Sequence, residues 1–127
     1  MKLIIGGAFQ GKIAYAQKYL GLNEGVIDGD TCRYEELFTC RGINHFHQYI
    51  RRMLIDGEDV NNLARLLIEK NPNCIVITNE LGYGVVPADA FERLFREQSG
   101  RICSELARHA TSVCRVVCGI GQVIKDA

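Results

Sequence analysis

The sequence predicts an α/β fold with a mainly parallel sheet, and two observations carry this prediction. Short apolar runs rich in β-branched residues alternate along the chain with longer segments of helical periodicity. The apolar runs also lack the regular alternation of a half-buried strand, which is typical of parallel strands covered by helices on both faces. The chain contains no internal repeat and no low-complexity stretch, so we expect one domain spanning residues 1–127.

Four segments have the composition of strands and are bounded by turn residues. They are Lys2–Ile5, Gly25–Asp28, Cys74–Thr78 and Ser112–Cys118. A last extended piece, Gln122–Lys125, follows the glycine-rich turn after the fourth segment. We expect this piece to return as an antiparallel hairpin at the C-terminal edge of the sheet.

Helical patterns fill the spaces between these strands. Lys12–Leu20 follows the first glycine loop, and Tyr34–Ile55 forms a long pattern that Gly42 can interrupt. Apolar residues with helical spacing continue from Val60 to Ile68, with Asp59 as the expected N-cap. Ala88–Ala110 is the last helical pattern. The order of strands and helices therefore favours a layered α/β domain.

Composition excludes several classes of function. Fifteen basic and fifteen acidic residues give a net charge of zero, which argues against a general electrostatic grip on nucleic acid. No apolar run approaches the roughly 20 residues that span a bilayer, and the apolar N-terminal segment is too short for a secretory signal. The six cysteines are then expected to be thiols of a cytoplasmic protein. We expect no nucleic-acid partner and no membrane span.

The strongest chemical signal is the loop Gly6-Gly7-Ala8-Phe9-Gln10-Gly11-Lys12-Ile13, which lies between the first predicted strand and the first predicted helix. Glycines let successive backbone N–H groups point at phosphate oxygens, and the helix adds its positive N-terminal end. Lys12 would reach the terminal phosphates as a point charge. The spacing predicts a three-layer domain like those of the P-loop NTPases, with this loop binding ATP or GTP. The alternative is a glycine turn with a solvated lysine.

One part of the phosphate-loop pattern is missing. The residue after the lysine is usually Ser or Thr, whose hydroxyl binds Mg²⁺, but here it is Ile13. Asp28 and Asp30 follow the second predicted strand, where ligands sit in open α/β sheets, and they are the candidate metal ligands. The alternative is that both acids cap a turn or the next helix.

Other segments resemble a known family. Four segments are similar to the adenosylcobinamide kinase / adenosylcobinamide-phosphate guanylyltransferase family. They are Val76–Pro87, Arg93–Arg101, Val116–Gly121 with Lys125, and the loop Gly6–Lys12. The resemblance implies a cytoplasmic, homotrimeric enzyme of cobalamin assembly with a P-loop fold. Such enzymes phosphorylate a hydroxyl of the corrinoid adenosylcobinamide with ATP or GTP. They then transfer GMP to that phosphate through a guanylylated histidine.

The chain departs from the family between the phosphate loop and Asn79. Family members are longer there, and only Gly25–Asp28 is predicted as a strand in this interval. In one alignment the histidine-bearing helix is deleted. In the other, His45 or His47 takes the role of the guanylylated histidine in a shifted register. Two residues apart on a helix, these histidines are expected to point to different sides. The guanylyl-transfer half of the activity is therefore doubtful.

Glu80 completes the set of candidate catalytic residues, with Lys12, Asp28 and Asp30. Its carboxylate follows the third predicted strand and could order a substrate hydroxyl or a metal-bound water. The alternative is a salt bridge to Arg93 or Arg96. Turn-shaping roles are expected for Gly82, Gly84 and Pro87.

Two functional hypotheses remain open at this point, beside the alternative of a trimeric structural domain without a ligand. The first is a compact cobinamide kinase that uses ATP or GTP with Mg²⁺. The second is a degenerate, non-catalytic protein that binds a nucleotide or corrinoid and serves a regulatory or partner-dependent role. Ile13 and the shortened middle of the chain favour the second hypothesis.

Overall fold

A computed structural model describes residues 1–81 and 88–126. Gly82, Gly84 and Pro87, with their predicted turn-shaping roles, lie outside the described residues. The described chain forms a sheet in the order β2-β3-β4-β1-β5-β6. All neighbouring pairs are parallel except β5 and β6, which form an antiparallel hairpin. The strands are β1 (Lys2–Gly6), β2 (Val26–Asp28), β3 (Gly42–Asn44), β4 (Ile75–Asn79), β5 (Ser112–Val117) and β6 (Ile120–Asp126).

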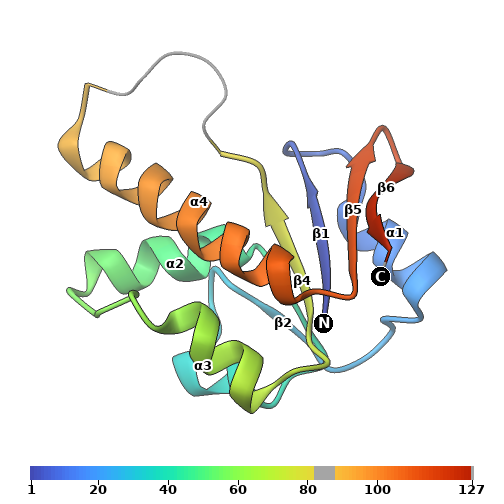
Figure 1. The fold of residues 1–127 in the computed structure, drawn as a ribbon, viewed down its shortest axis with the longest axis horizontal. Coiled ribbons are helices and arrows are strands. Elements are labelled where there is room, and N and C mark those ends of the chain that lie inside the picture. Colours follow the sequence, from blue (N-terminus) through green and yellow to red (C-terminus); the bar gives the residue numbers. More distant parts are fainter. Residues whose placement is uncertain (82–87, 127) are drawn as a thin grey trace.

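The helices make the outer two of three layers. Helices α2 (Phe46–Ile55), α3 (Leu63–Lys70) and α4 (Ala90–His109) gather on one side of the sheet, away from α1 (Lys12–Leu20) (Figure 1). Neighbouring residues of one strand serve different faces, since Leu3 packs with the large cluster under α2–α4 and Ile4 with the smaller cluster under α1. Both faces of the central strands are therefore buried, and the predicted three-layer α/β architecture with its C-terminal hairpin is confirmed.

The expectation of a long helix over Tyr34–Ile55 is wrong. This segment forms a 3₁₀ helix (Tyr34–Phe38), then β3, then α2. Gly42 enters the sheet where an added Cβ would lie 2.7 Å from the Leu22 side chain and 3.1 Å from the Ile75 carbonyl oxygen. Parallel pairing with β2 and β4 thus overrides the helical periodicity. Between the phosphate loop and β4 the chain forms two strands, β2 and β3, where the sequence predicts one.

Smaller differences occur at element boundaries. Helix α3 begins at Leu63, after the predicted start at Val60, and its N-cap position is Asn62. The Asp59 carboxylate accepts a hydrogen bond from the Asn61 N–H at 2.8 Å and so caps the preceding turn. Helix α4 keeps its predicted length within two residues at each end. Among the described residues, no helix is long and apolar enough to cross a bilayer.

Candidate functional site

The predicted phosphate loop lies between the carboxyl end of β1 and the start of α1. Gly11 has a left-handed backbone with φ of 85°, which favours glycine because it has no Cβ. Gly6 passes so close to β5 that an added Cβ would lie 2.6 Å from the Val116 carbonyl oxygen. Both positions therefore require glycine, and the loop turns directly into the N-terminus of α1.

Gln10 anchors this loop to the β5–β6 turn. Its backbone carbonyl accepts a hydrogen bond from the Gly119 N–H at 2.8 Å. Its side-chain Oε1 accepts a second bond from the Cys118 N–H at 2.7 Å. Sequence reasoning missed this contact, because nothing in the local pattern connects residues more than a hundred positions apart. The C-terminal hairpin therefore holds the loop in place.

Lys12 is folded back over the loop. The side chain is buried, with 8% exposed, and its Nζ donates a hydrogen bond to the Gly7 carbonyl oxygen at 2.5 Å. Burial lowers the pKa of the ammonium group, and the negative charge of Glu80 partly opposes this effect. The cation therefore lies where it can exchange a carbonyl partner for the oxygens of a bound phosphate.

A cavity of about 350 Å³ opens beside the loop, at the carboxyl edge of the sheet. The loop, the start of α2 and the end of β4 supply its walls. The lining residues are Ala8, Phe9, Gln10, Gly11, Lys12, Ile13, Asp30, Asn44, His45, His47, Gln48 and Asn79. Most of the residues that the sequence predicts for the site are thus brought together. Four of them, Gly6, Gly7, Asp28 and Glu80, do not line this cavity.

Asp28, Asp30 and His45 form a cluster at one side of the cavity. His45 Nδ1 lies 3.0 Å from Asp28 Oδ1 and 3.6 Å from Asp30 Oδ2, and one ligand atom from each residue falls within 4.8 Å of the others. The Asp30 N–H also donates to Asp28 Oδ1 at 2.9 Å, which is the turn-capping bond considered as an alternative. The cluster therefore combines a capped turn with three metal-binding groups.

The pKa of Asp28 reflects opposing effects. Burial raises it, but hydrogen bonds from the Asp30 N–H and the His45 ring, with the charges of His45 and Arg52, hold it below its ordinary value. The carboxylate is therefore ionised near neutral pH. An anionic Asp28 can accept this hydrogen bond only from a protonated Nδ1, so the neutral form of His45 in this contact has its lone pair on Nε2.

His47 has the opposite arrangement. Its Nδ1 accepts a hydrogen bond from the Asn79 N–H at 3.2 Å, so the ring proton lies on Nε2. Burial, with the nearby charges of His45 and Lys12, lowers its pKa to about 4. The expectation that the two histidines point to different sides is wrong, because both line the cavity with ring centroids 5.9 Å apart. His45 precedes the helix, with a left-handed φ of 57°.

Glu80 lies on a different side of the β4 terminus. Its Oε1 pairs with Arg115 Nε of β5 at 2.8 Å, so the salt bridge considered as an alternative exists, but with Arg115 and not with Arg93 or Arg96. The Glu80 N–H donates to the Gly6 carbonyl at 2.8 Å, which fixes the residue beside the phosphate loop. Because β5 is adjacent to β1 and β1 to β4, only the strand order reveals this pair.

Comparison with known proteins shows which family this chain resembles. Residues 44–124 match the family described as cobinamide kinase / cobinamide phosphate guanyltransferase. The bifunctional adenosylcobalamin biosynthesis protein CobU of Salmonella typhimurium is 45% identical over 70 residues, which is 52% of this chain and 39% of that protein. CobU of Escherichia coli is 45% identical over 51 residues, 40% of this chain and 28% of that protein. The matched segment thus covers less than half the length of either relative.

The family match includes Asn44 at the end of β3, all of α2 and β4, and most of the C-terminal hairpin, and so contains two walls of the cavity described above. It also agrees with the resemblance that the residues around Asn79 and Glu80 indicate. Because the matched residues make up more than half of the chain, this protein belongs to the cobinamide kinase / cobinamide phosphate guanyltransferase family.

Proposed function

We propose that this chain is a nucleotide-dependent kinase of cobalamin biosynthesis, which transfers the terminal phosphoryl group of ATP or GTP to a hydroxyl of a cobinamide-type corrinoid. One observation carries the proposal: the glycine loop, the buried ammonium of Lys12 and the Asp30 carboxylate meet around a single cavity at the carboxyl edge of the parallel sheet. This is where open α/β sheets bind ligands.

The groups around the cavity suit a polyphosphate. Backbone N–H groups of the loop and the N-terminus of α1 would face its oxygens. Lys12 would leave the Gly7 carbonyl for the terminal phosphates. His47, neutral and protonated on Nε2, adds a hydrogen-bond donor that costs no proton uptake near neutral pH. All of these contacts are made to phosphate oxygens, which ATP and GTP share, so they do not distinguish the two nucleotides.

The Asp28–Asp30–His45 cluster fits a divalent cation better than either carboxylate alone. Its donor atoms converge within 4.8 Å, and Asp30 and His45 also line the nucleotide cavity. The carboxylates of Asp28 and Asp30 would supply the oxygen donors that Mg²⁺ prefers, in place of the hydroxyl that Ile13 lacks, and His45 would keep its hydrogen bond to Asp28. A bound Mg²⁺ would neutralise charge on the phosphates during transfer.

The proposed reaction balances without a further reactant. The acceptor hydroxyl oxygen forms a bond to the terminal phosphorus, and the bond from that phosphorus to the bridging oxygen breaks. The nucleoside diphosphate leaves with that oxygen, and the hydroxyl proton is released to water. Glu80 has the position for ordering the acceptor, beside the loop and linked to it through its own N–H.

The second activity that the resemblance implies requires a nucleophilic histidine, and His45 suits this role better than His47. Asp28 accepts a hydrogen bond from the Nδ1–H group of His45, which leaves the Nε2 lone pair available. In His47 the same hydrogen bonding is reversed, because Nδ1 is an acceptor and Nε2 carries the proton. If incubation with GTP guanylylates the chain, mass spectrometry should find the adduct in the His47→Gln variant and lose it in His45→Gln.

Calorimetry with GTP and a turnover assay test the proposal together. Lys12→Ala should lose most of the affinity for GTP, whereas Lys18→Ala, an exposed lysine of the same helix, should bind like the unaltered chain. Mg²⁺ with ATP or GTP and cobinamide should yield a phosphorylated corrinoid. Equal GTP affinity in both lysine variants would contradict the nucleotide site.

Ile13 favours one competing function, a non-catalytic binder of nucleotide or corrinoid. The side chain lines the cavity and offers no oxygen where phosphate loops usually supply one. Both functions predict GTP binding that depends on Lys12. Only the kinase predicts phosphorylated corrinoid, so binding without product would support the non-catalytic alternative.

A further inference from the structure

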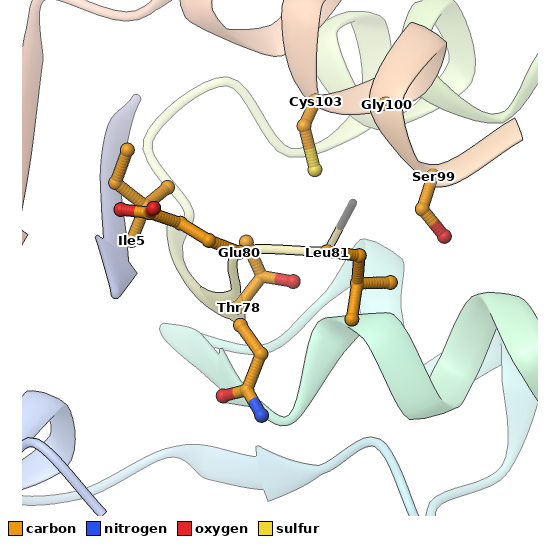
Figure 2. Close-up of a pocket in the computed structure, with 8 residues that line it drawn as sticks. Ile5, Thr78, Glu80, Leu81, Ser99, Gly100 and Cys103 are labelled. Carbon is orange, nitrogen blue, oxygen red and sulfur yellow. The ribbon is translucent and has the colours of Figure 1, made fainter. Parts of the chain in front are cut away.

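A second cavity lies on the other side of the β4 terminus, between the strand and α4. Its volume is about 330 Å³, within the range of small-ligand sites. Ile5, Thr78 and Leu81 line it from the sheet side, and Ser99, Gly100 and Cys103 from the helix (Figure 2). In Figure 2 the Cys103 thiol points from α4 toward the strand that carries Thr78. Asn79 lines this cavity and the phosphate-loop cavity, so the two sites share a wall.

Two buried hydroxyls line this cavity, and one of them lacks a partner. Thr78 is 2% exposed and Ser99 is 3% exposed; the Thr78 hydroxyl contacts the Cys103 thiol, and the Ser99 hydroxyl has no hydrogen-bond partner among the described residues. A buried polar group without a partner costs about 1–3 kcal/mol. The unpartnered Ser99 hydroxyl on the helix, with the Thr78 hydroxyl in the lining from the strand, indicates a place where a ligand supplies the missing hydrogen bond.

The remaining lining restricts the charge of that ligand. The Glu80 carboxylate is paired with Arg115, so its charge is compensated within the site. Burial raises the pKa of the Cys103 thiol to about 11, so the sulfur is neutral at physiological pH. Ile5 and Leu81 add apolar surface. A neutral group with a compact apolar body and at least one hydroxyl or amide therefore matches the cavity.

We propose that this cavity binds the hydroxyl-bearing arm of the phosphoryl acceptor, with the Thr78 and Ser99 hydroxyls as its hydrogen-bond partners. The inference rests on the proposed kinase function, which it extends by placing the acceptor across Asn79 from the nucleotide. A cavity of this size accommodates a side arm and excludes a macrocycle, so the bulk of a large acceptor stays outside.

Propane-1,2-diol is a suitable probe, because it carries vicinal hydroxyls on a short carbon chain. Titration of the full-length chain, followed by amide NMR, should give saturable shifts at residues of β4 and α4. Thr78→Val and Ser99→Ala should each weaken binding at least fivefold. Ser104→Ala removes an exposed hydroxyl of the same helix and should leave the affinity unchanged. Lactate has the same carbon skeleton with a carboxylate and should bind at least tenfold more weakly.

A blocking variant provides a second measurement. A Cβ at Gly100 would meet no atom within 4 Å, so Gly100→Leu extends a larger side chain from open space at the wall of the cavity. This variant should lose diol binding and keep the circular dichroism of the unaltered chain. Equal diol affinity in all variants, or no saturable binding to the unaltered chain, would overturn the proposal.

The two proposals fail in different ways. Each protein is also titrated with a non-hydrolysable GTP analogue. Analogue binding without diol binding would overturn the acceptor site and leave the nucleotide site intact. Diol binding without analogue binding would overturn the kinase function, and with it the acceptor role assigned to the cavity.

Discussion

The Nδ1 atom of His47 accepts a hydrogen bond from the Asn79 N–H, and this bond joins the first turn of α2 to the end of β4. Asn79 is the residue that the two cavities share. The bond therefore fixes the wall between the proposed nucleotide and acceptor sites. It also requires His47 to be neutral with its proton on Nε2, because a proton on Nδ1 would face the N–H of Asn79.

Protonation of His47 should weaken the fold in mild acid. Its pKa is lowered to about 4 in the folded chain, against about 6.5 when unfolded, so the unfolded chain binds more protons between these values. The stabilising contribution is complete above pH 6.5 and declines as the pH falls from there toward 4. The loss over this window amounts to roughly 3 kcal/mol.

Urea denaturation at a series of pH values measures this effect. His47→Gln keeps a hydrogen-bond acceptor for the Asn79 N–H but cannot take up a proton, so it should show a shallower loss of unfolding free energy between pH 6.5 and 4. The difference between the two proteins isolates His47 from the carboxylates that titrate in the same range. Parallel curves would show that His47 is not the group responsible.

Gly29 and Gly100 should respond oppositely to the same substitution. An added Cβ at Gly29 would lie 2.1 Å from the His45 carbonyl oxygen, a backbone atom that cannot move alone. Gly29→Ala should cost about 2 kcal/mol or more and disturb the Asp28–His45 contact. At Gly100 the Cβ meets open space within a helix, so Gly100→Ala should gain about 0.5–1 kcal/mol. Thermal or urea unfolding measures the change in stability of both variants. A Gly29→Ala variant as stable as the unaltered chain would contradict the close contact between residue 29 and the His45 carbonyl oxygen.

Gln10→Ala should weaken nucleotide binding without unfolding the chain. The side chain contributes one of the two hydrogen bonds that hold the phosphate loop to the β5–β6 turn, and the backbone bond to Gly119 remains. Loss of one such bond corresponds to about 1 kcal/mol, or roughly a fivefold rise in Kd for GTP. Gln17→Ala, an exposed glutamine on α1, is the matched control for calorimetry. Unchanged affinity in both variants would show that the loop holds its shape without this bond.

Local sequence signals predicted the parts of the fold that depend on local chemistry. Helix α1 occupies its predicted bounds because the glycine loop before it and Gly21 after it mark its ends. Strand β3 was missed because three residues between two helical patterns carry almost no periodicity, and pairing with β2 and β4 decides their conformation. Missing β3 also meant missing part of the candidate site, because β3 places His45 beside Asp28, which ends the adjacent strand β2.

Contacts between distant segments could not be predicted from the sequence, because they also depend on strand pairing. The pairs Glu80–Arg115 and Gln10–Cys118 depend on the order of strands in the sheet. The second cavity was also unpredicted, because Thr78 and Ser99 look like ordinary strand and helix residues until their burial is known. By contrast, the loop from Gly6 to Ile13 was recognisable, because its glycine spacing expresses a backbone requirement that few other structures share.

Ile13→Ser tests whether the missing hydroxyl limits the site. The substitution restores an oxygen at the position where phosphate loops usually bind Mg²⁺. Removal of a half-buried isoleucine side chain, which packs against the cluster under α1, should cost about 1 kcal/mol of stability. Ile13→Ala has the same loss of bulk without the hydroxyl and is the matched control.

If the hydroxyl reaches the cation, Ile13→Ser should raise the Mg²⁺-dependent part of GTP affinity at least tenfold over Ile13→Ala. Titrations with Mg²⁺ and with EDTA separate this part from the phosphate contacts of Lys12. Corrinoid phosphorylation by Ile13→Ser that exceeds the unaltered chain would identify the native site as weakened by Ile13. Equal behaviour of the two variants would place the cation away from position 13, which leaves the Asp28–Asp30–His45 cluster to hold it without help from the loop.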